Sequence, residues 1–168
     1  MNTKKIITIC KTDAKIAPVF SGVFPSDCLP KSVFYPTAFV LNTDPKSKPG
    51  THWVSIYIDG EGRGDYFDSY GKEPPISFKR FLDKNCIQWQ YNNRQLQAPL
   101  TSVCGQYCIL FLHLRCRNVS MQSILSQFGI DLVKNDRCVI NFINKKYDVN
   151  TELIDIEFIA DQICRELV

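Results

Sequence analysis

The chain has 168 residues, of which 45% are hydrophobic and 22% charged, the balance of one ordinary globular domain. These proportions exclude a disordered chain, and apolar runs such as residues 108–112 are far too short to span a bilayer. The net charge of +3 does not by itself indicate a nucleic-acid-binding protein. We therefore expect a single domain over residues 1–168.

Eight cysteines occur without regular spacing, and the first residues, MNTKKIITICK, lack the apolar length and cleavage site of a secretory signal. Without such a signal, reduced thiols are expected rather than a disulfide framework. The sequence thus predicts a protein that is intracellular and not secreted. Only two histidines are present, His52 and His113.

In chain order, residues 17–36 contain four prolines and should form an extended, turn-rich entry segment. The pattern then predicts strands at 37–42, 52–58, 64–70 and 86–91, with a short helix at 75–83. The DGEGR turn at 59–63 makes a hairpin of the second and third of these strands.

The remainder of the chain is predicted to be helical. Residues 103–117 are apolar nearly all round and indicate a buried helix. Further helices are expected from a cap at Ser120 to Phe128, and over 136–146 and 151–167. Strands first and helices later make an α+β fold: a central mixed sheet, a buried helix carrying Cys104, and C-terminal helices.

Cys104 is the first candidate for chemistry. It follows Thr101 and Ser102, either of which could cap the helix, so its thiol would lie in the first turn, where exposed amides stabilise a thiolate. Gly105 leaves room beside it for a substrate backbone. The alternative is a buried structural cysteine, the more common fate of any one cysteine.

A cysteine hydrolase also needs a base, and His is the usual one. His113 lies nine residues along the helix of Cys104, about 13 Å away along the axis and about 180° around it. It cannot reach Cys104 and is predicted to be a core or interface residue. His52, at the start of a strand, is therefore the candidate base, with a surface strand-end histidine as the alternative.

Hairpin geometry selects the acid that would orient His52. With DGEGR as the loop, Ile58 faces Gly64 and Val54 faces Asp68, so His52 and Asp68 are diagonal neighbours about 7 Å apart at Cβ. Asp65 would face Tyr57, roughly 16 Å along the strand from His52. Asp68 is predicted to orient His52, although a register slip of one residue would turn it to the other face.

Acyl transfer also needs donors for the developing oxyanion. The backbone N–H of Cys104 can serve as one, and Gln97, seven residues earlier, is a candidate for the second. Spacing alone does not separate Gln97 from Gln95 or Gln106. Trp53 could shield the site or contact an imidazolium ion, or could equally be a core tryptophan.

A zinc site is the competing chemistry on the same helix. Cys104, Cys108, His113 and Cys116 are ligand types, but they fall at roughly 0°, 40°, 180° and 120° around the axis. They cannot converge tetrahedrally on one ion. No metal is therefore expected.

Taken together, HWVSIYID, YFDSYG and QAPLTSVCGQYCILFLHL resemble the adenovirus-type cysteine protease family, adenain, and the related proteases of Polinton or Maverick-type elements. The order is His, acid, Gln, Cys, with Gln seven residues before a Cys-Gly pair. The resemblance extends upstream through APVFSGVFPSDCLP and covers about residues 16–117.

The resemblance implies the fold shared with SUMO and ubiquitin-like proteases, a triad of Cys104, His52 and Asp68, and Gln97 in the oxyanion hole. It implies peptide hydrolysis through a thioester, after glycine-containing sites in capsid or core precursor proteins. Trp53 would wall a narrow channel for small substrate residues. If the protein is viral, the host nucleus or the virion is the implied location.

The resemblance also implies activators. Cys86 lies eleven residues before Gln97, as does the adenain cysteine that forms a disulfide with a short activating peptide; the alternative is a reduced strand cysteine. DNA stimulates that family, but the basic residues here (Lys4, Lys5, Arg115, Arg117, Lys145, Lys146) are scattered. The chemistry itself requires no cofactor, and we expect a monomer that does not bind membranes.

Two departures from the family pattern stand out: a shorter tail, and Asp where adenovirus enzymes often use Glu. The leading hypothesis is a cysteine endopeptidase that matures virion proteins. One alternative is an isopeptidase that removes ubiquitin or SUMO after Gly-Gly with the same triad. Another is a non-catalytic binding module, which is disfavoured because every catalytic position holds a competent residue.

Overall fold

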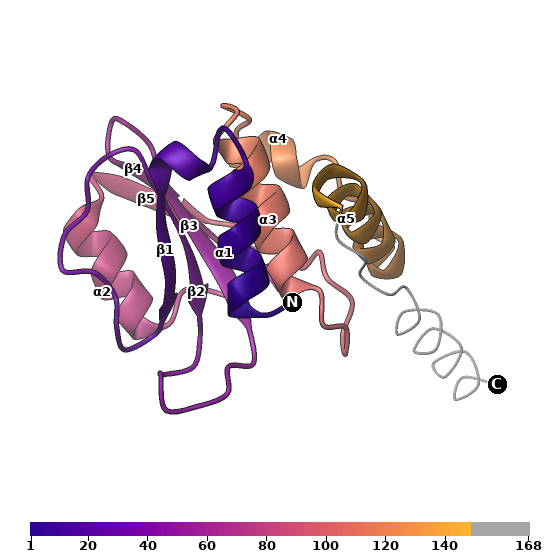
Figure 1. Ribbon diagram of the computed structural model, residues 1–168, viewed down its shortest axis with the longest axis horizontal. Helices are drawn as coiled ribbons and strands as arrows, with labels where there is room; N and C mark the ends of the chain where they lie inside the picture. The colour runs from indigo at the N-terminus through magenta and orange to yellow at the C-terminus, as the bar shows by residue number, and fades with distance from the viewer. Residues whose placement is uncertain (149–168) are drawn as a thin grey trace.

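The computed structural model describes residues 1–148, and these build an α+β fold around one mixed sheet (Figure 1). The strands follow the chain in the order β1-β2-β3-β4-β5 across the sheet. They are β1 (Phe20–Pro25), β2 (Thr37–Asn42), β3 (Trp53–Ile58), β4 (Arg63–Phe67) and β5 (Gln88–Tyr91). The two outer pairings are parallel and the two inner ones antiparallel, which confirms the predicted mixed sheet.

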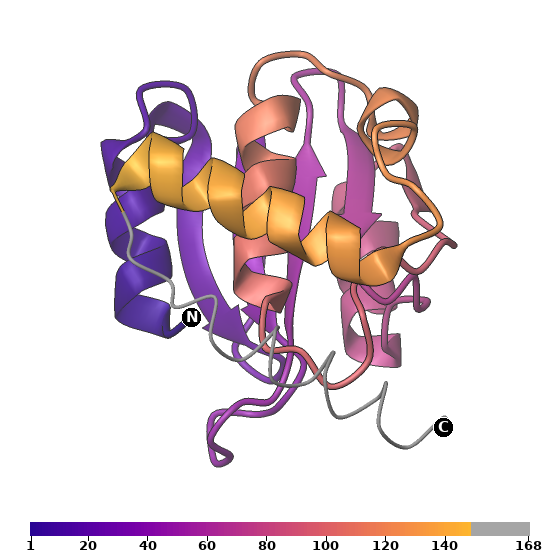
Figure 2. The ribbon, with the colours of Figure 1, turned by 90° about the vertical axis from the view of Figure 1, so that its right-hand side faces the viewer.

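Helices cover both faces of this sheet. One face carries α2 (Ile76–Asn85) alone, and the other carries the rest, with α5 lying across the outside of α3 (Figure 2). The helices of that second layer are α1 (Thr3–Thr12), α3 (Cys104–Arg115), α4 (Met121–Leu125) and α5 (Leu132–Tyr147). A short 3-10 turn at Ala17–Val19 leads into β1.

Each face of the sheet has its own hydrophobic core. Under α2, Phe39, Ile56 and Tyr66 pack against Phe78 and Leu82. On the other face the mostly buried helix α3 fills the space between the sheet and the helices α1, α4 and α5. Because α3 is surrounded by protein, its apolar residues occupy every side, as the sequence predicted.

The sequence-based elements agree with most of the structure. The strand at 37–42 is β2, the hairpin is β3 and β4, and Ser120 caps α4 by accepting a hydrogen bond from the Ser123 N–H. Helix α5 begins at Leu132, four residues before its predicted start. The helix predicted at 151–167 lies outside the described residues.

Two N-terminal elements were not anticipated. Helix α1 is capped by Asn2 and buries Ile6, Ile9 and Cys10 on the sheet side. The entry segment contains β1, which is extended as expected but also pairs in parallel with β2. No described helix is both long enough and apolar enough to cross a membrane.

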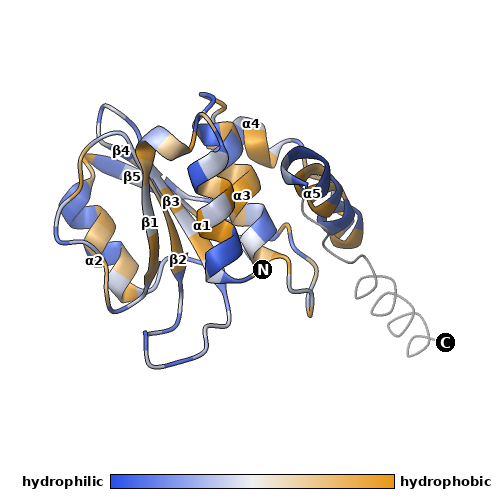
Figure 3. Cartoon of the chain, in the orientation of Figure 1, coloured by the Kyte–Doolittle hydropathy of each residue, from blue (hydrophilic) through white to orange (hydrophobic). Residues whose placement is uncertain are grey.

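The ends of β3, β4 and α3 meet at one end of the molecule. Figure 3 shows the hydrophilic loop between β2 and β3 at the same end as the N-terminus and the start of α3. Residues just outside these strand and helix ends can therefore face one another, and this is where the candidate residues lie.

Candidate active site

The β3–β4 hairpin places His52 beside Asp68. The paired residues include Ile58 with Gly64 and Tyr57 with Asp65, the register expected from the DGEGR turn. His52 immediately precedes β3 and Asp68 immediately follows β4, and His52 Nε2 lies 2.7 Å from Asp68 Oδ1. The competing carboxylate of Asp65 is bonded instead to Arg115 Nε at 2.6 Å.

Asp68 is held by backbone and side-chain donors that the sequence analysis did not identify. Its Oδ1 also accepts the Tyr70 backbone N–H at 2.8 Å. The Asn92 amide accepts the Asp68 N–H at 2.8 Å and donates to the Asp68 carbonyl at 2.6 Å. Asn92 follows β5 and is almost fully buried. Only the tertiary pairing of β4 with β5 brings it here, so no local sequence signal could have revealed it.

Cys104 is the first residue of α3 and is 8% exposed. The predicted cap at Thr101 or Ser102 is wrong: the N-cap is Val103, without a side-chain hydrogen bond. The Thr101 hydroxyl bonds Asp136 and the Ala98 carbonyl instead. The exposed amides at the start of α3 remain directed at the site.

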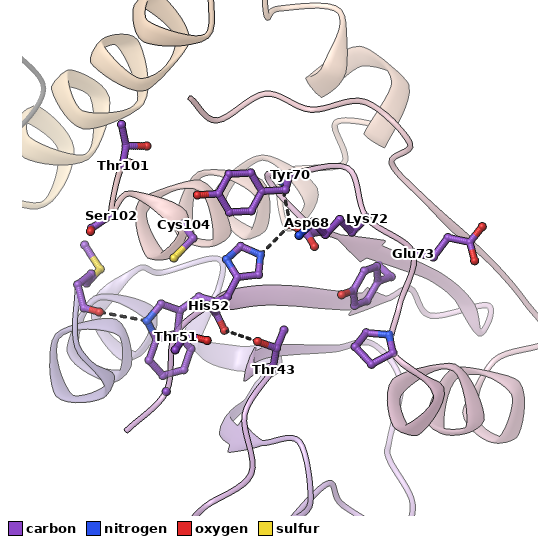
Figure 4. A pocket seen from close by; sticks show the side chains of 15 residues that line it. Thr43, Thr51, His52, Asp68, Tyr70, Lys72, Glu73, Thr101, Ser102 and Cys104 are labelled. Carbon is purple, nitrogen blue, oxygen red and sulfur yellow. Dashed lines mark hydrogen bonds and ion pairs between the residues drawn. The ribbon is translucent and has the colours of Figure 1, made fainter. Parts of the chain in front are cut away.

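His52 lies between Asp68 and Cys104 (Figure 4). Burial alone would lower the pKa of His52, but its hydrogen bonds to Asp68 and Cys104 outweigh burial and raise that pKa to about 9. Burial alone would raise the pKa of Cys104, but hydrogen bonds from His52 and the Trp53 backbone N–H lower it. The opposite shifts favour a thiolate–imidazolium pair.

These side chains line a cavity of about 670 Å³. Its wall includes Met1 and Trp53, whose indole N–H donates to the Met1 carbonyl at 3.1 Å. A Cβ on Gly105 would lie 3.0 Å from Met1 Cβ and 3.4 Å from Trp53 Cδ1. Only glycine therefore fits without displacing this wall. Met1, which was not predicted from the sequence, lies near the thiol together with Trp53 and Gly105.

Gln97 lies behind the cavity wall rather than on it. It is fully buried, and its Nε2 donates to the Thr101 carbonyl at 2.6 Å and to the Tyr70 hydroxyl at 3.1 Å. Its Oε1 accepts from the Ser69 hydroxyl at 2.7 Å, which fixes the orientation of the amide. Thr101 and Tyr70 line the cavity whereas Gln97 does not. Its predicted direct role in the oxyanion hole therefore stays a prediction.

A buried carboxylate on α5 holds the loop that precedes Cys104. Asp136 is fully buried and accepts the Thr101 hydroxyl at 2.9 Å, the Tyr107 hydroxyl at 2.8 Å and the Ala98 N–H at 3.2 Å. Burial raises its pKa to about 6, although these hydrogen bonds act in the opposite direction. Asp136 is not among the site residues predicted from the sequence.

The other candidates lie apart from this site. Cys86 follows α2, is half-buried, and packs where a Cβ on Gly64 would lie. Burial, helped by Asp65, raises the pKa of Cys86 to about 11, so little of it is the thiolate that disulfide exchange requires. His113 is buried against Asp13, far along α3 from Cys104. Among residues 1–148 no three His, Cys, Asp or Glu side chains are grouped to hold a metal ion.

Two of the basic residues considered as DNA contacts form ion pairs inside the protein. Arg115 pairs with Asp65, and Arg117 pairs with Asp13 at 3.0 Å. Both carboxylates are buried. Of the scattered basic residues, these two are therefore already paired with carboxylates of the protein.

Comparison with known proteins identifies relatives, although no family model matches the chain. The chain is 30% identical over 99 residues to a cysteine protease of African swine fever virus, covering 52% of this chain and 36% of the viral protein. It is 25% identical over 111 residues to the protease of snake adenovirus serotype 1, covering 57% of this chain and 53% of that protein. The chain thus spans about a third to a half of the length of these relatives.

Among solved structures, the Chlamydia trachomatis effector protein Cdu1, determined bound to ubiquitin, matches with a TM-score of 0.50. The match covers 70% of this chain and 64% of the effector at 20% identity, a likeness of fold. The sequence relatives belong to one class, viral cysteine proteases, and the structural match shows a fold shared with the ubiquitin-bound effector.

Proposed function

We propose that the protein is a cysteine endopeptidase with Cys104 as nucleophile, His52 as general base and acid, and Asp68 as the residue that orients His52. The observation that carries this proposal is the position of His52 between Asp68 and Cys104, with the pKa of His52 raised and that of Cys104 lowered. The viral cysteine protease relatives support the same reaction.

The geometry gives each group a step. The Cys104 thiolate attacks the scissile carbonyl carbon, the carbonyl oxygen becomes anionic, and the Cys104 backbone N–H donates to it. The imidazolium of His52 then gives its proton to the leaving amine, and the C–N bond breaks to leave a thioester. Water attacks the thioester with His52 as base, the C–S bond breaks, and Cys104 leaves as thiolate.

The cavity favours small substrate residues on the acyl side of the cleaved bond. Trp53 and Met1 lie close to Gly105 next to Cys104, so we propose that a substrate side chain has little room at this point of the cavity. A glycine-containing site in a capsid or core precursor protein would satisfy this restriction. We propose such precursors as substrates, with DNA and a peptide bonded at Cys86 as activators to be tested.

A ubiquitin-like modifier is the second candidate substrate. The fold match to an effector determined bound to ubiquitin favours it, because the same cavity could admit a Gly-Gly tail. Hydrolysis of ubiquitin or SUMO fused to aminomethylcoumarin, compared with a short fluorogenic peptide ending in Gly-Gly, separates the two. A preference for the intact modifier of at least 100-fold would favour the isopeptidase.

The first test is the pH dependence of alkylation at each cysteine, mapped by mass spectrometry in the wild type and in His52→Ala. Because the pKa of Cys104 is lowered, Cys104 should react fast near pH 6, where an ordinary thiol is mostly protonated. Hydrolysis should fall as the pH rises through about 9, where His52 loses the proton that the leaving amine needs. Reaction of Cys104 no faster than of Cys108 in the wild type would contradict the proposal.

A further inference from the structure

Tyr70 contacts both His52 and Asp68. Its ring centroid lies 5.0 Å from that of His52, with the two planes at 37°. Its backbone N–H donates to Asp68 Oδ1, the same oxygen that accepts from His52. These contacts with His52 and Asp68 fix the position of Tyr70. Tyr70 also lines the cavity in which a substrate would bind.

The Tyr70 hydroxyl has a proton to give. It accepts the Gln97 Nε2–H at 3.1 Å, and among residues 1–148 its own O–H makes no hydrogen bond to an acceptor. Figure 4 shows this hydroxyl on the Cys104 side of His52, and the charge of Cys104 acts on it. Burial and that charge raise the pKa of Tyr70, so the hydroxyl stays protonated and able to donate.

Gln97 is not free to fill this role itself. Its amide gives one hydrogen to the Thr101 carbonyl at 2.6 Å and directs the other toward the Tyr70 and Thr101 hydroxyls. Rotation is opposed by the Ser69 hydroxyl on Oε1. Of these two hydrogen-bonded residues, Tyr70 lines the cavity and Gln97 lies behind it.

We propose that Tyr70 is a further catalytic residue, whose hydroxyl donates a hydrogen bond to the oxyanion opposite the Cys104 backbone N–H. Gln97 then acts as a positioning residue: by donating to the phenol oxygen it fixes the hydroxyl and strengthens it as a donor. This inference rests on the proposed endopeptidase function and assigns its second oxyanion donor.

Tyr70→Phe tests the proposal because it keeps the ring on His52 and removes only the hydroxyl. We expect kcat for a fluorogenic Gly-Gly peptide to fall about 10- to 100-fold, with KM changed less than about threefold. Alkylation of Cys104 by iodoacetamide forms no oxyanion, so its rate should stay within about twofold of the wild type. Tyr35→Phe, which loses a hydroxyl bonded to the Asn85 carbonyl away from the cavity, is the matched control.

The outcomes are distinct. A wild-type kcat in Tyr70→Phe, with a large loss in Gln97→Ala, would overturn the proposal and return the oxyanion role to Gln97. Equal losses of hydrolysis and alkylation in Tyr70→Phe would also overturn it, because the hydroxyl would then act on the thiolate. Absence of hydrolysis in the folded wild type, with ordinary Cys104 reactivity, would instead contradict the proposed function.

Discussion

The protein contains two His–Asp pairs with opposite electrostatics. His52 meets Asp68 at 2.7 Å beside the cavity, and the pKa of this histidine rises to about 9. His113 meets Asp13 at 3.1 Å between α1 and α3, and the pKa of that histidine is lowered by burial and by Arg117.

Cys104 contributes to the raised pKa of His52, and burial is the largest cause of the lowered pKa of His113. A further difference lies in what else each carboxylate contacts. Asp13 accepts from Arg117 at 3.0 Å and 3.1 Å and from the Tyr147 hydroxyl at 2.7 Å, so its charge is already compensated. Besides His52, the only donor to the Asp68 carboxylate among residues 1–148 is the neutral Tyr70 backbone N–H. A carboxylate raises the pKa of a histidine when no nearby cation competes for it, and the pair at Asp13 serves to join helices instead.

The largest difference in activity between the two His–Asp pairs should appear when each histidine is replaced by alanine. His52→Ala should lower kcat by at least about 10³-fold, because the thiol loses its base and the leaving amine its acid. His113→Ala should leave kcat within about threefold and lower the free energy of unfolding by about 2 kcal/mol, through lost buried contacts. Peptide hydrolysis and urea unfolding of both variants measure these effects. Equal losses of activity in the two variants, with both proteins folded, would contradict the assignment of His52 as the catalytic histidine.

Removing the orienting acid should have a smaller effect. Asp68→Ala should lower kcat by roughly 10²-fold while Cys104 and His52 remain, since orientation matters less than nucleophile or base. It should also lower the pH at which the upper limb of the activity profile falls, because Asp68, one of the two groups that raise the pKa of His52, is gone. Asp65→Ala, whose carboxylate is bonded to Arg115, is the control, and its upper limb should stay in place.

The smallest effect should follow from making the electrostatic surroundings of the His113–Asp13 pair resemble those of the His52–Asp68 pair. Arg117→Gln removes the cation that competes for Asp13, so the pKa of His113 should rise while that of His52 stays unchanged. The cost should be about 1 kcal/mol of folding free energy, since Arg117 is partly exposed. NMR titration of the two histidines measures both values; an unmoved His113 would show that burial alone sets its pKa.

The hairpin and its consequences could be predicted from the sequence. The DGEGR turn and the alternation around it fix the register, so the pairing of Ile58 with Gly64 places Asp68 beside His52 without further information. The two histidines are also distinguishable in advance, because one helix cannot bring His113 back to Cys104.

The support around Cys104 could not be predicted in the same way. Thr101 has the right type and position for a helix cap, yet Asp136, from a helix 35 residues later, accepts its hydroxyl. Asn92 and Tyr70 likewise act through tertiary contacts that leave no periodic trace. Helix α1 was not predicted because its buried residues, Ile6, Ile9 and Cys10, span little more than one turn.

The buried carboxylate of Asp136 implies a trade-off between stability and order at the nucleophile loop. Its pKa is raised from 3.8 to about 6, so folding favours the protonated form, and this contribution to stability is full below about pH 4 and lost as the pH rises through 6. The charged form, however, is the stronger acceptor for Thr101 and Ala98, which lead the chain to Cys104. Near neutral pH the ionised carboxylate therefore lowers the free energy of unfolding but makes stronger hydrogen bonds to the loop that precedes Cys104.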